Sequence, residues 1–126
     1  MTDNQKTVMI IEDEPDAAEL FAEMMRVSGF NVLKSYSSVP AMNMITQEKP
    51  DVIILDIMMP DISGLDILRN MRSKADLEKI PVVVVSAKGT PLDVREGLNA
   101  GASVYLTKPV GFADLKNAVE RALRDS

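Results

Sequence analysis

The 126-residue chain contains no cysteine and no histidine. Without cysteine it forms no disulfide bond, and it has no thiolate to offer as a metal ligand or a nucleophile. Without histidine, a Ser-His-Asp triad and a histidine-bound zinc site are excluded as well. Any bound metal must therefore be held by oxygen atoms, which favours Mg²⁺, Ca²⁺ or Mn²⁺.

Aromatic residues, net positive charge and long apolar runs are also scarce. Only 4% of the residues are aromatic, which argues against a base-stacking surface. The net charge of −5 and the pI near 4.7 argue against direct nucleic-acid binding. No apolar run approaches the ~20 residues that cross a bilayer, and the polar, acidic N-terminus differs from a signal peptide. We therefore expect a cytoplasmic protein without a membrane partner.

Short apolar runs alternate with stretches of helical periodicity along the whole chain. The apolar runs predict strands at residues 8–11, 30–33, 52–55, 82–85 and 103–107, and the second of these strands is expected to end in Ser35 or nearby. Helices are expected at residues 15–28, from 40, from 65, at 92–99 and at 112–123. Five strands that are each followed by a helix require right-handed crossovers, so the fold class is α/β. We expect a three-layer sandwich around a five-stranded parallel sheet with five helices, as one domain over residues 1–126 with its core at about 7–123.

Polar residues stand at the ends of four of these strands. In chain order they are Glu12 and Asp13, Asp56, Ser86 and Lys108. Because the carboxyl ends of parallel strands meet at one edge of the sheet, where ligands bind in such folds, these side chains should lie together. Two carboxylates about 4 Å apart repel by ~4 kcal/mol at an effective dielectric constant of 20, so the cluster requires a cation.

This set of residues is suited to phosphoryl transfer. A transferring phosphoryl group carries dispersed negative charge, so catalysis consists mainly of positioning and neutralisation. Asp13 and Asp56 can hold an octahedral Mg²⁺, with Glu12 acting through a water molecule. A free oxygen of Asp56 can attack phosphorus and form an aspartyl phosphate. Lys108 would contact one phosphoryl oxygen, and Ser86 would donate a hydrogen bond to another.

Four segments carry a resemblance to a known family. They are Ile11-Glu12-Asp13-Glu14, Leu55-Asp56-Ile57-Met58-Met59-Pro60 with Gly64, Val85-Ser86-Ala87, and Tyr105-Leu106-Thr107-Lys108-Pro109. Together they resemble the receiver domain of two-component response regulators, over about residues 7–123. The resemblance implies a flavodoxin-like fold similar to that of the chemotaxis regulators, with the strand order 2-1-3-4-5.

The resemblance also implies a role for each site residue. Asp56 would be the phosphoacceptor, and the donor would be a sensor histidine kinase or a histidine phosphotransfer protein. Asp13, Asp56 and the backbone carbonyl of Met58 would hold Mg²⁺, which Mn²⁺ could replace. Ser86 and Tyr105 would be the switch pair, in which the hydroxyl moves towards the phosphate and the ring turns inward. Such a receiver is a signalling protein rather than an enzyme, and it catalyses only its own phosphorylation and dephosphorylation.

Two further side chains would set the lifetime of the phosphorylated state. Met58 lies two residues after Asp56 and Lys88 lies two after Ser86, where such side chains flank the path of the attacking water in this family. An apolar Met58 cannot orient that water, so we predict slow self-dephosphorylation. The resemblance further implies a cis peptide bond before Pro109.

The signal is expected to leave through the helix at 92–99, the last strand and the last helix. Phosphorylation adds about −1.5 to −2 charges at one point, to which Ser86 and Lys108 can respond directly. The helix at 92–99 has the poorest apolar stripe and contains Gly97, so we expect it to be the mobile element. Ala102-Ser103-Val104 stands where dimerising transcription-factor receivers carry an Asp pair, which argues against a salt-bridged dimer. The chain could be a stand-alone regulator or an excised receiver, and its output partner or domain is left open.

Three other classes of protein fit parts of the pattern. A phosphohydrolase with an aspartyl nucleophile, of the haloacid dehalogenase kind, needs a second acid at the position of Met58. An FMN-binding flavodoxin needs a loop rich in Ser, Thr and Gly after the first strand, whereas the segment from Glu12 to Asp16 would repel phosphate. A degenerate receiver that acts only as a binding module would not need the complete set of acids, Ser86 and Lys108.

Overall fold

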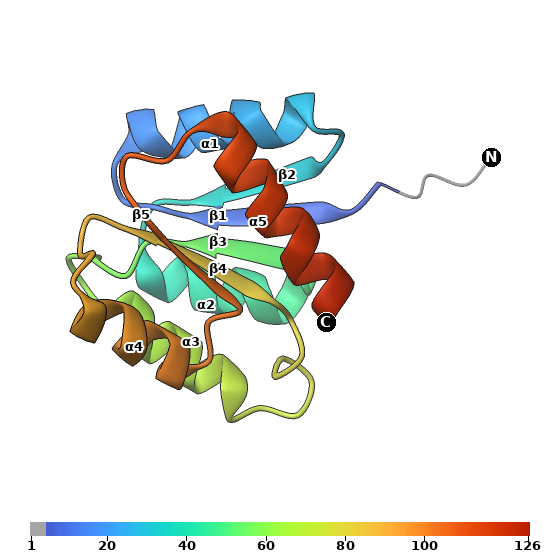
Figure 1. Cartoon of the computed structure of the whole chain (residues 1–126). Helices are drawn as coiled ribbons and strands as arrows, with labels where there is room; N and C mark the ends of the chain where they lie inside the picture. Colours follow the sequence, from blue (N-terminus) through green and yellow to red (C-terminus); the bar gives the residue numbers. More distant parts are fainter. Residues whose placement is uncertain (1–4) are drawn as a thin grey trace.

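The structure, a computed structural model, describes residues 5–126 and has a five-stranded sheet between two layers of helices (Figure 1). The strands are β1 (Thr7–Ile11), β2 (Asn31–Ser35), β3 (Val52–Leu55), β4 (Val82–Ser86) and β5 (Val104–Thr107). Their order is β2-β1-β3-β4-β5, and each neighbouring pair is parallel. The predicted fold class and strand order are therefore confirmed.

Five helices connect and cover the strands. They are α1 (Pro15–Val27), α2 (Ser38–Glu48), α3 (Gly64–Arg72), α4 (Pro91–Ala100) and α5 (Phe112–Asp125). Figure 1 shows α1 and α5 on one face of the sheet and α2, α3 and α4 on the other. Across residues 5–126, none of the helices combines the length and the apolarity that crossing a bilayer would require.

The central strands are buried on both faces, which explains their continuous apolar sequence. In β1, Val8 and Ile10 pack with residues of α1 and α5, whereas Met9 and Ile11 pack with residues of α2 and α3. All four residues of β3 are buried in the same alternating way. A strand of this kind is stable only between two helix layers. The polar residues that follow it must therefore lie at the carboxyl end of the strand, outside the buried part of the sheet.

Several elements begin or end at other residues than the sequence predicts, and α2 and β2 show the reasons. α2 begins at Ser38 rather than at Pro40, because proline is tolerated in the first turn of a helix, where backbone N–H groups have no intrahelical acceptor. β2 begins at Asn31, one residue after the start of the apolar run, and it ends at Ser35, as the sequence predicts, where it pairs with Ile11 of β1. As an edge strand it is less buried than β1 or β3 and tolerates polar residues, so its apolar signal is weak.

Before the amino ends of β4 and β5, Arg72 joins the end of α3 to the end of α4. Its Nε and Nη2 donate to the carbonyl of Gly101 at 3.0 and 2.8 Å, and its Nη1 donates to the carbonyl of Ile80 at 2.8 Å. Gly101 caps α4 in the left-handed conformation, with φ 116°. The C-terminal end of α4 is thus fixed both to α3 and to the segment before β4.

Candidate functional site

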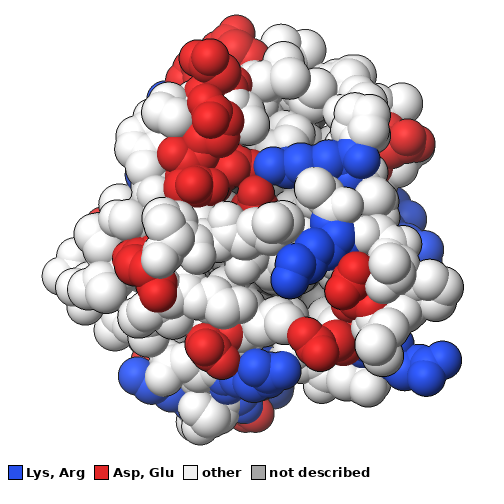
Figure 2. Space-filling model, turned by 90° about the vertical axis from the view of Figure 1, so that its left-hand side faces the viewer, with Lys and Arg blue, Asp and Glu red and all other residues white. Residues whose placement is uncertain are grey.

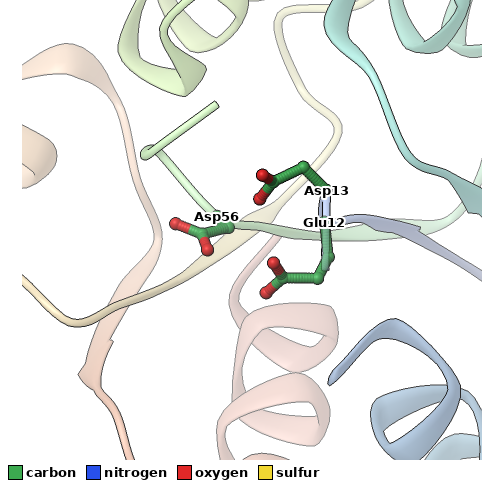
Figure 3. Close-up of side chains that lie close together, drawn as sticks. All are labelled: Glu12, Asp13 and Asp56. Carbon is green, nitrogen blue, oxygen red and sulfur yellow. The ribbon is translucent and has the colours of Figure 1, made fainter. Parts of the chain in front are cut away.

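The neighbouring strands β1 and β3 bring three carboxylates together. Ile11 pairs with Leu55 in the sheet, and the N–H of Asp56 donates to the carbonyl of Ile11 at 3.0 Å. The side chains of Glu12, Asp13 and Asp56 point into one space (Figure 3), where each offers an oxygen within 4.8 Å of the others. The fold therefore contains the acidic cluster that the strand ends predict.

Lys108 is the cation beside these carboxylates. Its Nζ donates to Glu12 Oε1 at 2.7 Å and to Asp56 Oδ2 at 3.0 Å. Partial burial alone would lower the pKa of Lys108, but these hydrogen bonds raise it above its usual value. The ammonium group therefore stays charged and offsets part of the repulsion between the acids. The peptide bond from Lys108 to Pro109 is cis, as the resemblance implies.

Acidic and basic side chains are unevenly distributed over this face of the molecule. Figure 2 shows a band of acidic side chains that reaches the centre of the face, with basic side chains beside its end. Glu14 and Asp16, at the start of α1 and close in sequence to Asp13, are exposed acids. This face therefore favours the approach of a cation over that of a free anion.

Glu12 is the most buried of the three acids, with 2% of its surface exposed. Burial raises the pKa of Glu12 above its ordinary value, and the charge of Asp56 adds to the increase. Hydrogen bonds from Lys108 and from the N–H of Glu14 oppose it. The direct partners of this carboxylate are thus Lys108 and the N–H of Glu14. Its predicted contact with a metal through water stays a prediction.

The backbone after Asp56 is fixed by close packing on the start of α3. The N–H of Met58 donates to Asp56 Oδ1 at 2.9 Å, and the N–H of Gly64 donates to the carbonyl of Ile57 at 3.0 Å. A Cβ on Gly64 would lie 2.5 Å from the Cα of Ile57 and 2.7 Å from the backbone oxygen of Asp56. Only glycine permits this approach, which holds the carboxylate of Asp56 at the end of β3.

Asp61 joins the same loop to α2, a contact that the sequence did not predict. Its carboxylate accepts a hydrogen bond from the backbone N–H of Ser38 at 3.0 Å, and the hydroxyl of Ser38 donates to the carbonyl of Ile62 at 2.6 Å. Desolvation alone would raise the pKa of Asp61, but its hydrogen bonds with Ser38 and with the backbone lower it. The loop that carries the site is therefore attached to α2 as well as to α3.

Ser86 and Tyr105 are connected through the main chain of Lys88. Ser86 is fully buried at the end of β4, and its Oγ accepts a hydrogen bond from the N–H of Lys88 at 3.1 Å. The hydroxyl of Tyr105 donates to the carbonyl of Lys88. The sequence predicts a tuning role for the Lys88 side chain, and it gives no sign of this backbone connection between the expected switch residues.

A cavity of about 440 Å³ opens beside the carboxylates. Asp13 lines it together with Met58 from the loop after β3 and Lys88 from the loop after β4. Met58 is 48% exposed, so water has access to its side chain. The two residues predicted to tune the phosphoryl lifetime thus line the same space.

The donor set fits a hard divalent cation. Mg²⁺ prefers oxygen ligands and is bound in proteins by one or two carboxylates together with water molecules, and Mn²⁺ accepts similar ligands. Glu12, Asp13 and Asp56 form the acidic cluster that could hold such an ion, and the assignment of Asp13 and Asp56 as its ligands stays a prediction. The predicted contribution of the Met58 carbonyl stays a prediction.

The fold, with its acids and lysine at the carboxyl edge of the sheet, is that of the receiver domains of signalling proteins. Residues 8–120 match the family model described as the response regulator receiver domain. The chain therefore belongs to the family of response regulator receiver domains, which confirms the resemblance seen in the sequence.

Solved structures of receiver domains are similar over almost the whole chain. A response regulator from Chloroflexus aurantiacus is 27% identical, with a TM-score of 0.92, covering 96% of this chain and 99% of its own. The receiver domain of a Francisella response regulator is 26% identical, with a TM-score of 0.89 and coverages of 96% and 98%. The signal receiver domain of a signal transduction histidine kinase from Syntrophus aciditrophicus is 29% identical, with a TM-score of 0.87 and coverages of 95% and 91%.

Proposed function

We propose that this receiver is a phosphorylation-dependent switch in which Asp56 accepts a phosphoryl group in the presence of Mg²⁺. The donor would be a histidine of a sensor kinase or of a phosphotransfer protein, and an output partner or domain would respond. The observation that carries the proposal is the position of Asp56. It is 6% exposed, it contacts Lys108, and it lies beside Asp13 and Glu12.

The residues around Asp56 suit each part of the transfer. A carboxylate oxygen of Asp56 attacks phosphorus and forms a P–O bond, while the P–N bond to the donor histidine breaks and the nitrogen takes the electron pair. Mg²⁺, when bound, neutralises charge on the phosphoryl oxygens. Lys108 supplies a second positive charge, since its Nζ lies 3.0 Å from Asp56 Oδ2. Ser86, at the end of the adjacent strand, would donate its hydroxyl to a phosphoryl oxygen.

Incubation with acetyl phosphate and Mg²⁺, followed by intact mass spectrometry, tests the proposal. We expect one added phosphoryl group in the wild type and in Asp114→Asn, which alters an exposed carboxylate on α5. We expect none in Asp56→Asn or after removal of Mg²⁺ by a chelator. An adduct that persists in Asp56→Asn would place the phosphoryl group elsewhere. A wild type that remains unmodified by both acetyl phosphate and phosphohistidine donors would favour the degenerate receiver.

We predict that Met58→Asn shortens the lifetime of the aspartyl phosphate. The side chain of Met58 lines the cavity beside Asp13, and an amide in its place can orient a water molecule for attack on phosphorus. Decay should become faster by roughly tenfold, which corresponds to about 1.4 kcal/mol of barrier. The decay is followed by mass spectrometry after removal of the donor, with Met58→Leu as the apolar control. Equal decay rates in the wild type and Met58→Asn would contradict a tuning role for this residue.

The apolar surface next to Lys108 is where we infer that the protein donor binds. Leu20 and Phe21 of α1 form this surface with Pro109 and Val110, and Lys108 itself lines it. A donor bound there would lie close to Asp56, because Lys108 contacts both the surface and that carboxylate. Leu20 is 55% exposed and can therefore be changed without loss of core packing.

We predict that Leu20→Asp slows phosphorylation by a histidine phosphotransfer donor by about tenfold or more and leaves phosphorylation by acetyl phosphate unchanged. A charge in an apolar contact must be desolvated when the partner binds, which weakens binding. Leu92→Asp is the matched control, because Leu92 is 68% exposed and lies on α4. Equal slowing by both variants, or an equal loss of acetyl phosphate labelling, would rule out this donor surface.

A further inference from the structure

α4 packs on the sheet through a residue without a side chain. Gly97 is the one buried residue of this helix, whereas each of the other four helices buries at least three. Glycine in a helix interior is less favourable than alanine by roughly 0.5–1 kcal/mol, so its presence here needs a structural reason. The reason lies in the residue that packs against it.

The ring of Tyr105 occupies the space that a side chain at position 97 would fill. A Cβ on Gly97 would lie 2.6 Å from Cδ2 and 2.7 Å from Cε2 of Tyr105. Both distances are shorter than the contact distance between two carbon atoms, about 3.5 Å or more. A methyl group at position 97 and the ring of Tyr105 therefore cannot both keep their present positions.

The hydroxyl end of the same ring holds the loop between β4 and α4. It donates to the carbonyl of Lys88, while the N–H of Lys88 donates to Oγ of Ser86 at 3.1 Å. Burial raises the pKa of Tyr105, so the phenol keeps the proton that it donates. Ser86, Lys88, Tyr105 and Gly97 thus form a continuous set of contacts from the end of β4 to the middle of α4.

We propose that Gly97 is a positioning residue, which lets the ring of Tyr105 pack against α4 and thereby keeps its hydroxyl on the carbonyl of Lys88. The contacts of the ring with Gly97 and of its hydroxyl with the main chain of Lys88 include no atom of Asp56. A side chain at position 97 would therefore displace the ring of Tyr105 without touching the phosphoacceptor. The link from this arrangement to signalling rests on the proposed function, whereas the position of the ring does not.

The position of the ring can be measured directly, because the chain has only two tyrosines. Labelling the full chain with 3-fluorotyrosine gives one fluorine NMR signal from Tyr105 and one from Tyr36, which is 46% exposed and serves as an internal reference. In Gly97→Ala we expect the Tyr105 signal to shift towards that of Tyr36, while the Tyr36 signal stays unchanged. Asn99→Ala, an exposed change on the same helix, should leave both signals in place. A Tyr105 signal that is the same in the wild type and Gly97→Ala overturns the proposal.

A thermal double-mutant cycle tests the same contact and also covers a poorly folded Gly97→Ala variant. Alone, Gly97→Ala should lower the melting temperature, because the methyl group collides with the ring. In a Tyr105→Ala background the collision is absent and the higher helix propensity of alanine remains, so the same change should raise the melting temperature by roughly 3–5 °C. A change of the same sign and size in both backgrounds would show that the two residues act independently, which contradicts the proposal.

Failure of this inference and failure of the proposed function can be told apart. Both tests are made without a phosphodonor, so their outcome does not depend on whether Asp56 is phosphorylated. Labelling of Gly97→Ala by acetyl phosphate should match that of the wild type, because Gly97 lines neither the carboxylate cluster nor the cavity beside it. Normal labelling with an unmoved Tyr105 signal would refute the positioning role alone.

Discussion

Lys108→Met is expected to lower the free energy of unfolding by about 3–5 kcal/mol in the absence of divalent metal, because it leaves two buried carboxylates without the cation that pairs with them. The Glu12 and Asp56 side chains are 2% and 8% exposed, and both accept hydrogen bonds from Lys108. Methionine has a similar volume and length, so the variant removes the charge while filling the space. Urea denaturation in the presence of a chelator measures the change, and Lys79→Met at an exposed position is the control.

The pH dependence of this loss identifies its cause. The folded-state pKa of Lys108 is raised above its ordinary value of 10.5. The stability that Lys108 contributes is therefore fully present below pH 10.5 and is lost only as the pH rises through the folded-state pKa. The folded-state pKa of Glu12 is also raised, so protonation of Glu12 stabilises the fold as the pH falls towards 4.5. The deficit of Lys108→Met should therefore be largest near neutral pH and smaller near 4.5. A deficit that is equal at both pH values would indicate lost packing rather than unpaired charge.

Gly64→Ala is the second change with a large expected effect. It should lower the free energy of unfolding by about 3 kcal/mol. The new Cβ would lie 2.5 Å from the Cα of Ile57 and 2.7 Å from the backbone oxygen of Asp56. Both are backbone atoms, so relief requires α3 to move away from β3. We expect the variant to accept a phosphoryl group from acetyl phosphate more slowly as well, because the carboxylate of Asp56 moves with its backbone.

Gly111→Ala provides the matched control for this experiment. Gly111 precedes α5 as Gly64 begins α3, but a Cβ there would meet nothing within 4 Å, and its φ of −82° suits alanine. Gly111→Ala should lower the free energy of unfolding by no more than about 1 kcal/mol, the usual size of a helix-cap effect. Chemical denaturation and the rate of acetyl phosphate labelling are measured for both variants. Equal effects of the two changes would show that the close approach at Gly64 does not matter.

The sheet and the acids at its carboxyl edge could be predicted because short segments of the sequence carry the signal for each strand and for the acids that follow it. Val52 to Leu55 is apolar on both faces, as a central parallel strand must be, and a carboxylate follows it directly. The same pattern at Glu12 and Asp13 places the acids together once the strands are taken as neighbours. Lys108 was expected at this edge for the same reason, and its contacts with Glu12 and Asp56 agree with that position.

The contacts around the site depended on tertiary packing, which a single sequence does not reveal. Asp61 meets the backbone of Ser38 although 23 residues separate them, and nothing in their spacing indicates it. Gly97 suggested a weak, mobile helix, which stays a prediction, but it did not suggest that its missing side chain makes room for Tyr105. Lys88 attracted notice for its side chain, but its hydrogen bonds to Ser86 and Tyr105 are made by its main chain.

The bonds from Arg72 to the carbonyl of Gly101 make the two ends of α4 unequal. If α4 tilts on activation, Arg72 would act as a pivot at the C-terminal end, and the N-terminal end would follow the loop that contains Ser86 and Lys88. A helix of ten residues is about 15 Å long, so a tilt of roughly 10° about the pivot displaces its first turn by about 2.6 Å. Leu92 lies on that turn and is 68% exposed. A partner that binds around Leu92 would therefore meet the full displacement of the helix. One that binds near Asn99 would meet almost none of it.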